Sequence, residues 1–255
     1  RAQRGVAAAR AARPGRGGAP LAAVDLACGT GANVRRLAPR LPGPQRWRLL
    51  DADESLLRLA HARCAELAPS ITVDCEHADL AGPALESACA GADLVTASAL
   101  LDLVGAAWLE RLANACAASG AIALFALDYD GRRQCVPADP DDAAAHAAFD
   151  RHQRRDKGFG PALGPEAAAA AARAFAARGY RVERVASNWR LDARDAALQD
   201  ALLRGWAQAA VEAEPAARER WERWSARRLA FVADGMSVLR VGHEDLLAVP
   251  PFAAR

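Results

Sequence analysis

A glycine-rich turn constrains the fold of this chain more than any other feature of its sequence. The segment 24–33 reads VDLACGTGAN; it lies between the apolar run 21–26 and an amphipathic stretch over 32–41, which is the layout of strand, turn and helix. Gly29 and Gly31 lack a Cβ, so the turn can adopt positive φ and let a ligand approach the backbone. Free N–H groups at the start of the following helix suit a polar or anionic part of a ligand. The elements that follow decide what this turn is for.

The rest of the first half alternates short apolar segments with helical ones. We expect strands at 47–51, 71–75, 92–97 and 121–127, and helices at 54–67 and 106–118. Such alternation predicts a parallel sheet that helices cover on both faces. Because ligands of such sheets bind at the carboxyl ends of the strands, the positions of interest directly follow each strand. These positions are 25–33, 51–53, 78–80, 98–102 and 128–131.

The pattern changes after Asp128, where we expect a turn at Asp130-Gly131 and then mostly helices. Helices are predicted at 143–157, 166–178, 196–213 and 216–233, and strands at 180–189 and 236–241. The helical blocks 137–165 and 195–234 are additions to a minimal sheet-and-helix core, and we expect them to form a lid on a single domain over residues 21–255. Residues 1–20 are expected to hold a frayed helix and a linker. We interpret the N-terminus as trimmed, since Arg1 stands where a Met is expected.

Composition narrows the classes of protein. With 255 residues and 52% hydrophobic content, the chain can bury one core and a small cap. No apolar run approaches the roughly 18 residues of a membrane span, so no membrane association is expected. The six cysteines show neither C-x-x-C nor Cys/His ligand spacing, which predicts no metal site and a cytoplasmic protein with reduced thiols. Arginine and alanine abound as in a GC-rich, bacterial genome, and a net charge of +2 argues against a nucleic-acid partner.

The motifs of residues 21–128 resemble those of the class I S-adenosylmethionine-dependent methyltransferases. The first motif of this family reads acidic-x-Gly-x-Gly-x-Gly, and Asp25, Ala27, Gly29 and Gly31 occupy its places, with a small Ala27 for the first glycine. The resemblance implies an α/β fold: a Rossmann-like, doubly wound, mostly parallel seven-stranded sheet with helices on both faces, here with the extra helical lid. It also implies S-adenosyl-L-methionine as the methyl donor.

Two further acids match the family's motifs. Asp51 follows Gly29 by roughly 20 residues, where a carboxylate can accept two hydrogen bonds from the ribose diol. Asp53 is available to cap the next helix, which leaves Asp51 for the ligand. Asp79 is expected either to contact the adenine amino group or to be a simple turn residue, and Asp25 to meet the ammonium group of the donor or to brace the turn. The full expected donor set is Asp25, Ala27, Cys28, Gly29, Gly31, Asn33, Asp51, Ala52, Asp79, Leu80 and Ser98, with Ala52 and Leu80 flanking adenine and Cys28 packing in the turn.

NAD binding is the main alternative within the same fold, because an acid after the second strand also serves that cofactor. Its fingerprint is G-x-G-x-x-G. If the motif starts at Gly29, its third glycine falls on Val34, and if it starts at Ala27, the first glycine is missing. The sequence therefore favours S-adenosylmethionine over NAD.

The methyl acceptor is less clearly marked. No Asn-Pro-Pro-Tyr and no Pro-Cys follows the fourth strand, which argues against methylation of DNA bases. We expect in-line transfer to a small or medium-sized molecule, with the donor and acceptor held in alignment. Candidates for the catalytic positions are Asp102, Asp128, Tyr129 and His152, of which Asp128 and His152 suit a general base. Two alternatives stay open: an RNA (tRNA) methyltransferase that uses the basic cluster 151–157, and a non-catalytic S-adenosylmethionine-binding subunit. The oligomeric state stays open as well.

Overall fold

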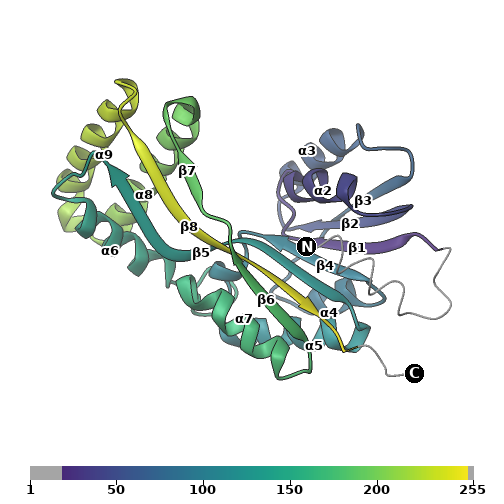
Figure 1. Ribbon diagram of the computed structural model, residues 1–255. Helices are drawn as coiled ribbons and strands as arrows, with labels where there is room; N and C mark the ends of the chain where they lie inside the picture. Colours follow the sequence, from purple (N-terminus) through teal and green to yellow (C-terminus); the bar gives the residue numbers. More distant parts are fainter. Residues whose placement is uncertain (1–18, 252–255) are drawn as a thin grey trace.

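One mixed sheet organises the molecule in the computed structural model, which describes residues 19–251 (Figure 1). Its strand order is β3-β2-β1-β4-β5-β8-β6, and β7 pairs with β8 beside this path. The strands β1 to β5 are parallel, whereas β8 is antiparallel to β5, β6 and β7. The strands are β1 (Leu21–Leu26), β2 (Gln45–Asp51), β3 (Ile71–His77), β4 (Leu94–Ser98), β5 (Ile122–Val136), β6 (Arg181–Ala186), β7 (Trp189–Leu191) and β8 (Val238–Val249). The predicted α/β class with a mostly parallel, Rossmann-like sheet is confirmed.

Helices cover both faces of the parallel part because alternate strand residues point to opposite sides. Leu21 and Ala23 join a core cluster under α2 (Ala32–Leu37) and α3 (Glu54–Cys64). Val24 and Leu26 join the cluster on the other face, under α4 (Ala84–Cys89), α5 (Ala106–Ser119) and α7 (Ala167–Ala176). Short 3-10 turns complete the connections: η1 (Ala38–Arg40), η2 (Leu101–Leu103), η3 (Gly164–Glu166), η4 (Ala193–Asp195) and η5 (Pro215–Ala217).

A second lobe grows from the far ends of β5 and β8 (Figure 1). The helices α6 (Asp142–Gln153), α8 (Ala196–Ala213) and α9 (Arg218–Ala233) pack together on one face of the ribbon that β5, β8 and β7 form. This lobe has its own apolar core, which includes Trp206, Trp221 and Trp224. We call the ribbon of residues 129–136, 189–191 and 239–243, together with these three helices, the helical lobe. Within residues 19–251, no helix has the length and apolarity that crossing a membrane requires.

Several predicted boundaries in the second half are wrong. The turn expected at Asp130-Gly131 is absent, because β5 continues to Val136 through two register shifts against β8. Exposed polar residues alternate with buried ones such as Cys135 in this part of β5, so its sequence resembles that of a loop. The strand expected over 180–189 is two strands, β6 and β7, and the last strand runs on to Val249. The helix α4 was not predicted, and most of the expected N-terminal helix and linker lies in residues 1–18, outside the described residues.

Candidate functional site

Strained backbone occurs at the same level of three neighbouring strands. Ala27 after β1, Ala99 after β4 and Leu127 within β5 have φ of 50°, 53° and 58°, and they are the non-glycine residues of the described chain with positive φ. A left-handed conformation costs a residue with a side chain about 1–3 kcal/mol, and such strain concentrates at functional sites. We call the ends of β1, β2 and β4, together with residues 127–128 within β5, the carboxyl edge, and this strain marks it as the candidate site.

The glycine turn shapes the part of this edge that follows β1. Gly29 and Gly31 have φ of 54° and 72°. A Cβ on Gly31 would lie 3.0 Å from the Cys64 sulfur and 3.3 Å from the Ala60 Cβ, so glycine lets the turn pack on α3. A Cβ on Gly29 would meet nothing within 4 Å, which leaves space beside its backbone. One glycine therefore serves packing and the other leaves room for a ligand.

Asp25 carries a buried carboxylate oxygen without a partner. Its Oδ1 accepts a hydrogen bond of 2.7 Å from the Asn33 amide, which also donates to the Thr96 hydroxyl at 3.0 Å. Its Oδ2 is buried and has no hydrogen-bond partner among the described residues. Burial raises the pKa of Asp25 to about 7, and the nearby charge of Asp51 adds to this rise, while the Asn33 bond opposes it. A cationic group of a ligand would satisfy the free oxygen.

Asp51 ties the glycine turn to the end of β2. Its Oδ2 accepts from the Gly29 N–H at 2.8 Å, and its Oδ1 accepts from the Asp53 N–H at 3.0 Å. Each carboxylate oxygen has a second lone pair, so both can still accept from a diol. Asp53 caps α3 by accepting from the Ser55 and Leu56 N–H groups, as predicted. The ribose contact of Asp51 remains a prediction that this geometry permits.

The other expected donor residues lie around the same edge. Asp79 is exposed and accepts from the Ala81 N–H at 2.9 Å, so its turn role is visible and its adenine contact stays a prediction. Leu80 is buried in the core below, and Ala52 is exposed after β2. The Cys28 thiol packs in the core under α2, and burial raises its pKa. Ser98 ends β4 and is half-buried.

Two buried carboxyl groups lie near each other, Asp102 on η2 after β4 and Asp128 within β5. Asp128 accepts from the Leu101 N–H at 3.1 Å, while Asp128 Oδ2 and Asp102 Oδ1 have no partner among the described residues. Burial raises the pKa of Asp102 to about 6. Burial and the charge of Asp102 raise the pKa of Asp128 to about 8. Asp102 therefore ionises at a lower pH than Asp128, so around neutral pH one can accept a proton while the other keeps its own.

Tyr129 and His152 lie away from this pair. Because β5 alternates, Tyr129 points opposite to Asp128, into the helical lobe, where its hydroxyl donates to Asp150 at 3.3 Å. The His152 ring on α6 pairs with the Glu212 carboxylate of α8 at 2.8 Å. The structure thus brings Asp102 and Asp128 together and does not bring Tyr129 or His152 to them.

Asp245 was missed by the sequence analysis, although it shapes the edge. Its Oδ1 accepts from the N–H of the strained Leu127 at 2.9 Å and from the Ser187 hydroxyl at 2.7 Å. It comes from β8, more than a hundred residues after β5, and no local motif marks it. Within residues 19–251, no group of three or more His, Cys, Asp or Glu side chains is arranged to hold a metal ion.

Comparisons with known proteins find a domain match over part of this chain and a shared fold. Residues 23–121 match the family model described as a methyltransferase domain, whereas no curated protein matches the sequence. The solved structure of the YcgJ protein from Bacillus subtilis is similar at 11% identity and a TM-score of 0.50, over 97% of this chain and 99% of that chain. Mycolic acid cyclopropane synthase CmaA1, complexed with SAH and CTAB, is similar at 12% identity and a TM-score of 0.50, over 95% of this chain and 82% of that chain. These likenesses show a shared fold, and the family match shows a methyltransferase domain over residues 23–121.

Proposed function

We propose that this chain methylates a small or medium-sized molecule that carries an acidic O–H or N–H group. The proposal depends on one observation: the open glycine turn and the buried acids Asp102 and Asp128 lie at the same carboxyl edge. When bound, S-adenosylmethionine supplies an electrophilic methyl group on a sulfonium. The protein's task is to align the two reactants and to receive the proton that the acceptor loses.

The turn fits the donor on three observations. The unpaired Asp25 Oδ2 suits an ammonium group, and the open space beside Gly29 admits a ligand against the backbone. Asp51 keeps lone pairs for the ribose hydroxyls while it braces Gly29. We assign these three residues as the main donor contacts, with Asn33 as the residue that orients Asp25.

Asp102 is the proposed general base. Its pKa of about 6 leaves it largely ionised at neutral pH, whereas Asp128, with a pKa of about 8, is largely protonated and can donate a hydrogen bond. When the acceptor attacks the methyl carbon, the bond from carbon to sulfur breaks and its electrons return to sulfur. The acceptor's proton passes to the Asp102 carboxylate and from there to solvent.

The helical lobe favours a small acceptor over RNA. The basic cluster 151–157 is engaged within the lobe: Arg151 pairs with Glu214, His152 with Glu212, and Arg155 donates to the Glu212 carbonyl at 2.8 Å. Such paired cations offer little to a phosphate backbone. The helices α6, α8 and α9 pack on the face of the ribbon opposite to Asp128, so we assign them no contact with the acceptor.

Incubation with S-adenosylmethionine and a metabolite extract tests this proposal. Mass spectrometry should detect a product heavier by one CH2 that Asp102→Asn does not form, while S-adenosylhomocysteine still raises the melting temperature of both proteins. Methylation of added tRNA instead would favour the RNA alternative. Donor binding without any methylated product would favour the non-catalytic subunit.

A further inference from the structure

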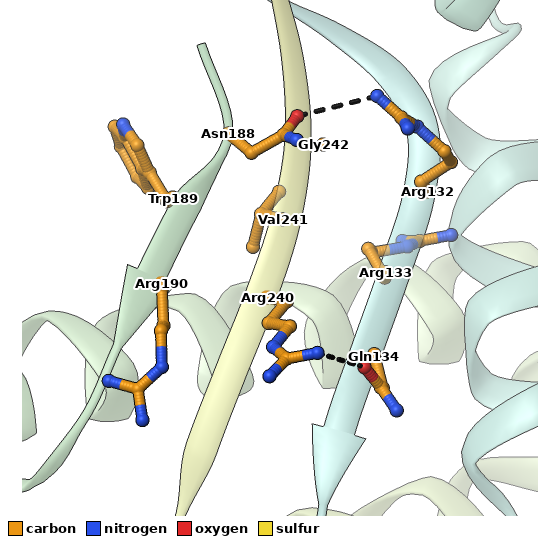
Figure 2. Close-up of a pocket in the computed structure, with 9 residues that line it drawn as sticks. All are labelled: Arg132, Arg133, Gln134, Asn188, Trp189, Arg190, Arg240, Val241 and Gly242. Carbon is orange, nitrogen blue, oxygen red and sulfur yellow. Dashed lines mark hydrogen bonds between the residues drawn. The ribbon is translucent and has the colours of Figure 1, made fainter. Parts of the chain in front are cut away.

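A cavity of about 270 Å³ lies on the face of the β5–β8–β7 ribbon that the helices leave open (Figure 2). Arg190, Arg240 and Gln134 face one another across the three strands in direct register. Directly opposed residues share one face of a sheet, so these side chains form a single polar row. Figure 2 shows this row, with Arg132 and Asn188 beyond it and Trp189 at its side. We call this surface the arginine groove.

The arginine groove carries more positive than negative charge. Arg132 pairs with Asp130, and Arg190 pairs with Asp192 at 3.0 Å, but Asp192 is shared with Arg194. Arg240 donates to the neutral Gln134 amide oxygen at 3.3 Å, and no carboxylate in residues 19–251 forms a salt bridge with it. The side chain of Arg190 is 58% exposed, so its guanidinium can reach a further partner. The groove therefore suits an anion held by two guanidinium groups.

The register of β8 connects the groove to the catalytic pair. Asp128 lies opposite Glu244, and Gln134 lies opposite Arg240. Residues 240, 242 and 244 alternate along β8 and so share one face, which places Asp128 on the same face as the groove. Four residues of strand span about 13 Å, which is the reach of a medium-sized molecule.

The Asp130 side chain lies directly on Gly242, between the groove and Asp128. A Cβ there would lie 2.0 Å from an oxygen of Asp130, so only glycine leaves room for the Asp130 side chain that pairs with Arg132. Trp189 lies opposite Val241 and alternates with Arg190, so its side chain packs against the lobe core on the other face, where it stacks on His243 with ring centroids 4.8 Å apart. The groove therefore offers a ligand mainly its two guanidinium groups.

We infer that the arginine groove binds a carboxylate or phosphate group of the methyl acceptor, with Arg190 and Arg240 as its main contacts. This inference rests on the proposed function and names its substrate class: an acidic small molecule whose anion sits about 13 Å along β8 from the level of Asp128.

The test uses phenyl phosphate and benzoate as anionic probes and phenol as their neutral counterpart. Binding is followed through the arginine Nε–H signals in NMR spectra of the full chain. We expect both anions to bind at least tenfold more tightly than phenol. The double variant R190Q/R240Q should bind both anions at least tenfold more weakly than the unmodified protein. The matched control R204Q removes an exposed arginine on α8, whose partner is Asp200, and should bind as the unmodified protein does.

Equal binding of phenol and the anions, or unchanged anion binding in R190Q/R240Q, would overturn the inference. Tight binding of a single-stranded RNA dodecamer that the same variant loses would overturn it too, since the groove would then be a nucleic-acid surface. Titration of S-adenosylhomocysteine into the same samples separates the two proposals: its failure to bind contradicts the proposed function, while the anion result stands by itself. Retained binding also shows that R190Q/R240Q is folded.

Discussion

The two halves of β5 belong to differently built regions. Up to Phe125, the strand lies in a parallel sheet whose site is held by close neighbours in sequence: Asn33 and Asp25 are 8 residues apart, and Gly29 and Asp51 are 22 apart. Beyond Tyr129, the strand supports the helical lobe, where Trp224 bonds to Asp142 across 82 residues and Arg227 to Asp139 across 88. The donor site is thus a local structure, whereas the acceptor region depends on distant pairing.

Because the two regions are built differently, we expect some variants to lose donor binding and others to lose methyl transfer alone. Damage to the lobe or to the acid pair should remove the reaction and leave the donor bound. Damage to the glycine turn should remove the donor.

The largest effect is expected from the acid pair. Asp102→Asn keeps the size of the side chain and removes the base, so we expect methyl transfer to fall about 100- to 1,000-fold, as for other general bases. The affinity for S-adenosylhomocysteine, measured by calorimetry, should change less than about threefold. Tyr129→Phe is the matched comparison, because its hydroxyl bonds to Asp150 in the lobe. A larger loss in Tyr129→Phe than in Asp102→Asn would contradict the assignment.

The second-largest effect is expected from truncating a side chain in the core of the helical lobe. Trp224 is fully buried and donates its indole N–H to Asp142 at 2.9 Å, so Trp224→Ala should destabilise the protein by about 3–5 kcal/mol in urea unfolding. Its residual folded fraction should still bind S-adenosylhomocysteine, because the turn belongs to the other region. Loss of both properties in the folded fraction would show that the two regions are not separable.

Two glycines give a matched pair for the turn. Gly31 and Gly91 have φ of 72° and 71°, but a Cβ meets Cys64 and Ala60 only at Gly31. Both alanine variants bear the left-handed strain of about 1 kcal/mol, and Gly31→Ala should in addition lower donor affinity about tenfold. Equal donor affinities in the two variants would show that the packing of the turn on α3 does not matter.

The smallest effect is a pH dependence of stability. The folded pKa of Asp128, about 8, lies above its ordinary value of 3.8, so the folded state holds this proton more tightly than the unfolded state. Stability from this group is therefore present below about pH 4 and lost as the pH rises toward 8. Asp128→Asn removes the buried carboxyl group, so its free energy of unfolding should exceed that of the unmodified protein by about 1–3 kcal/mol between pH 5 and pH 8. A gain that does not grow with pH would indicate an ordinary pKa.

The sequence was informative where structure is local. The order of strands and helices to residue 127 and the cap at Asp53 were predictable, because apolar periodicity and short-range hydrogen bonds determine them. The continuation of β5 past Gly131 was not, since its burial depends on β8, more than a hundred residues later. Asp245 and the arginine groove could not be predicted for the same reason: their residues come together only when β5, β8 and β7 pair.

Titration of S-adenosylhomocysteine into the unmodified protein and Asp51→Ala tests the central claim, that the carboxyl edge around the glycine turn holds the methyl donor. Asp51 braces Gly29 and offers both oxygens at the end of β2. The account predicts saturable binding to the unmodified protein, a loss of at least about 30-fold in Asp51→Ala from one lost charge-assisted contact, and no binding of NAD. Binding of NAD in its place, or equal S-adenosylhomocysteine affinity in both proteins, would contradict it.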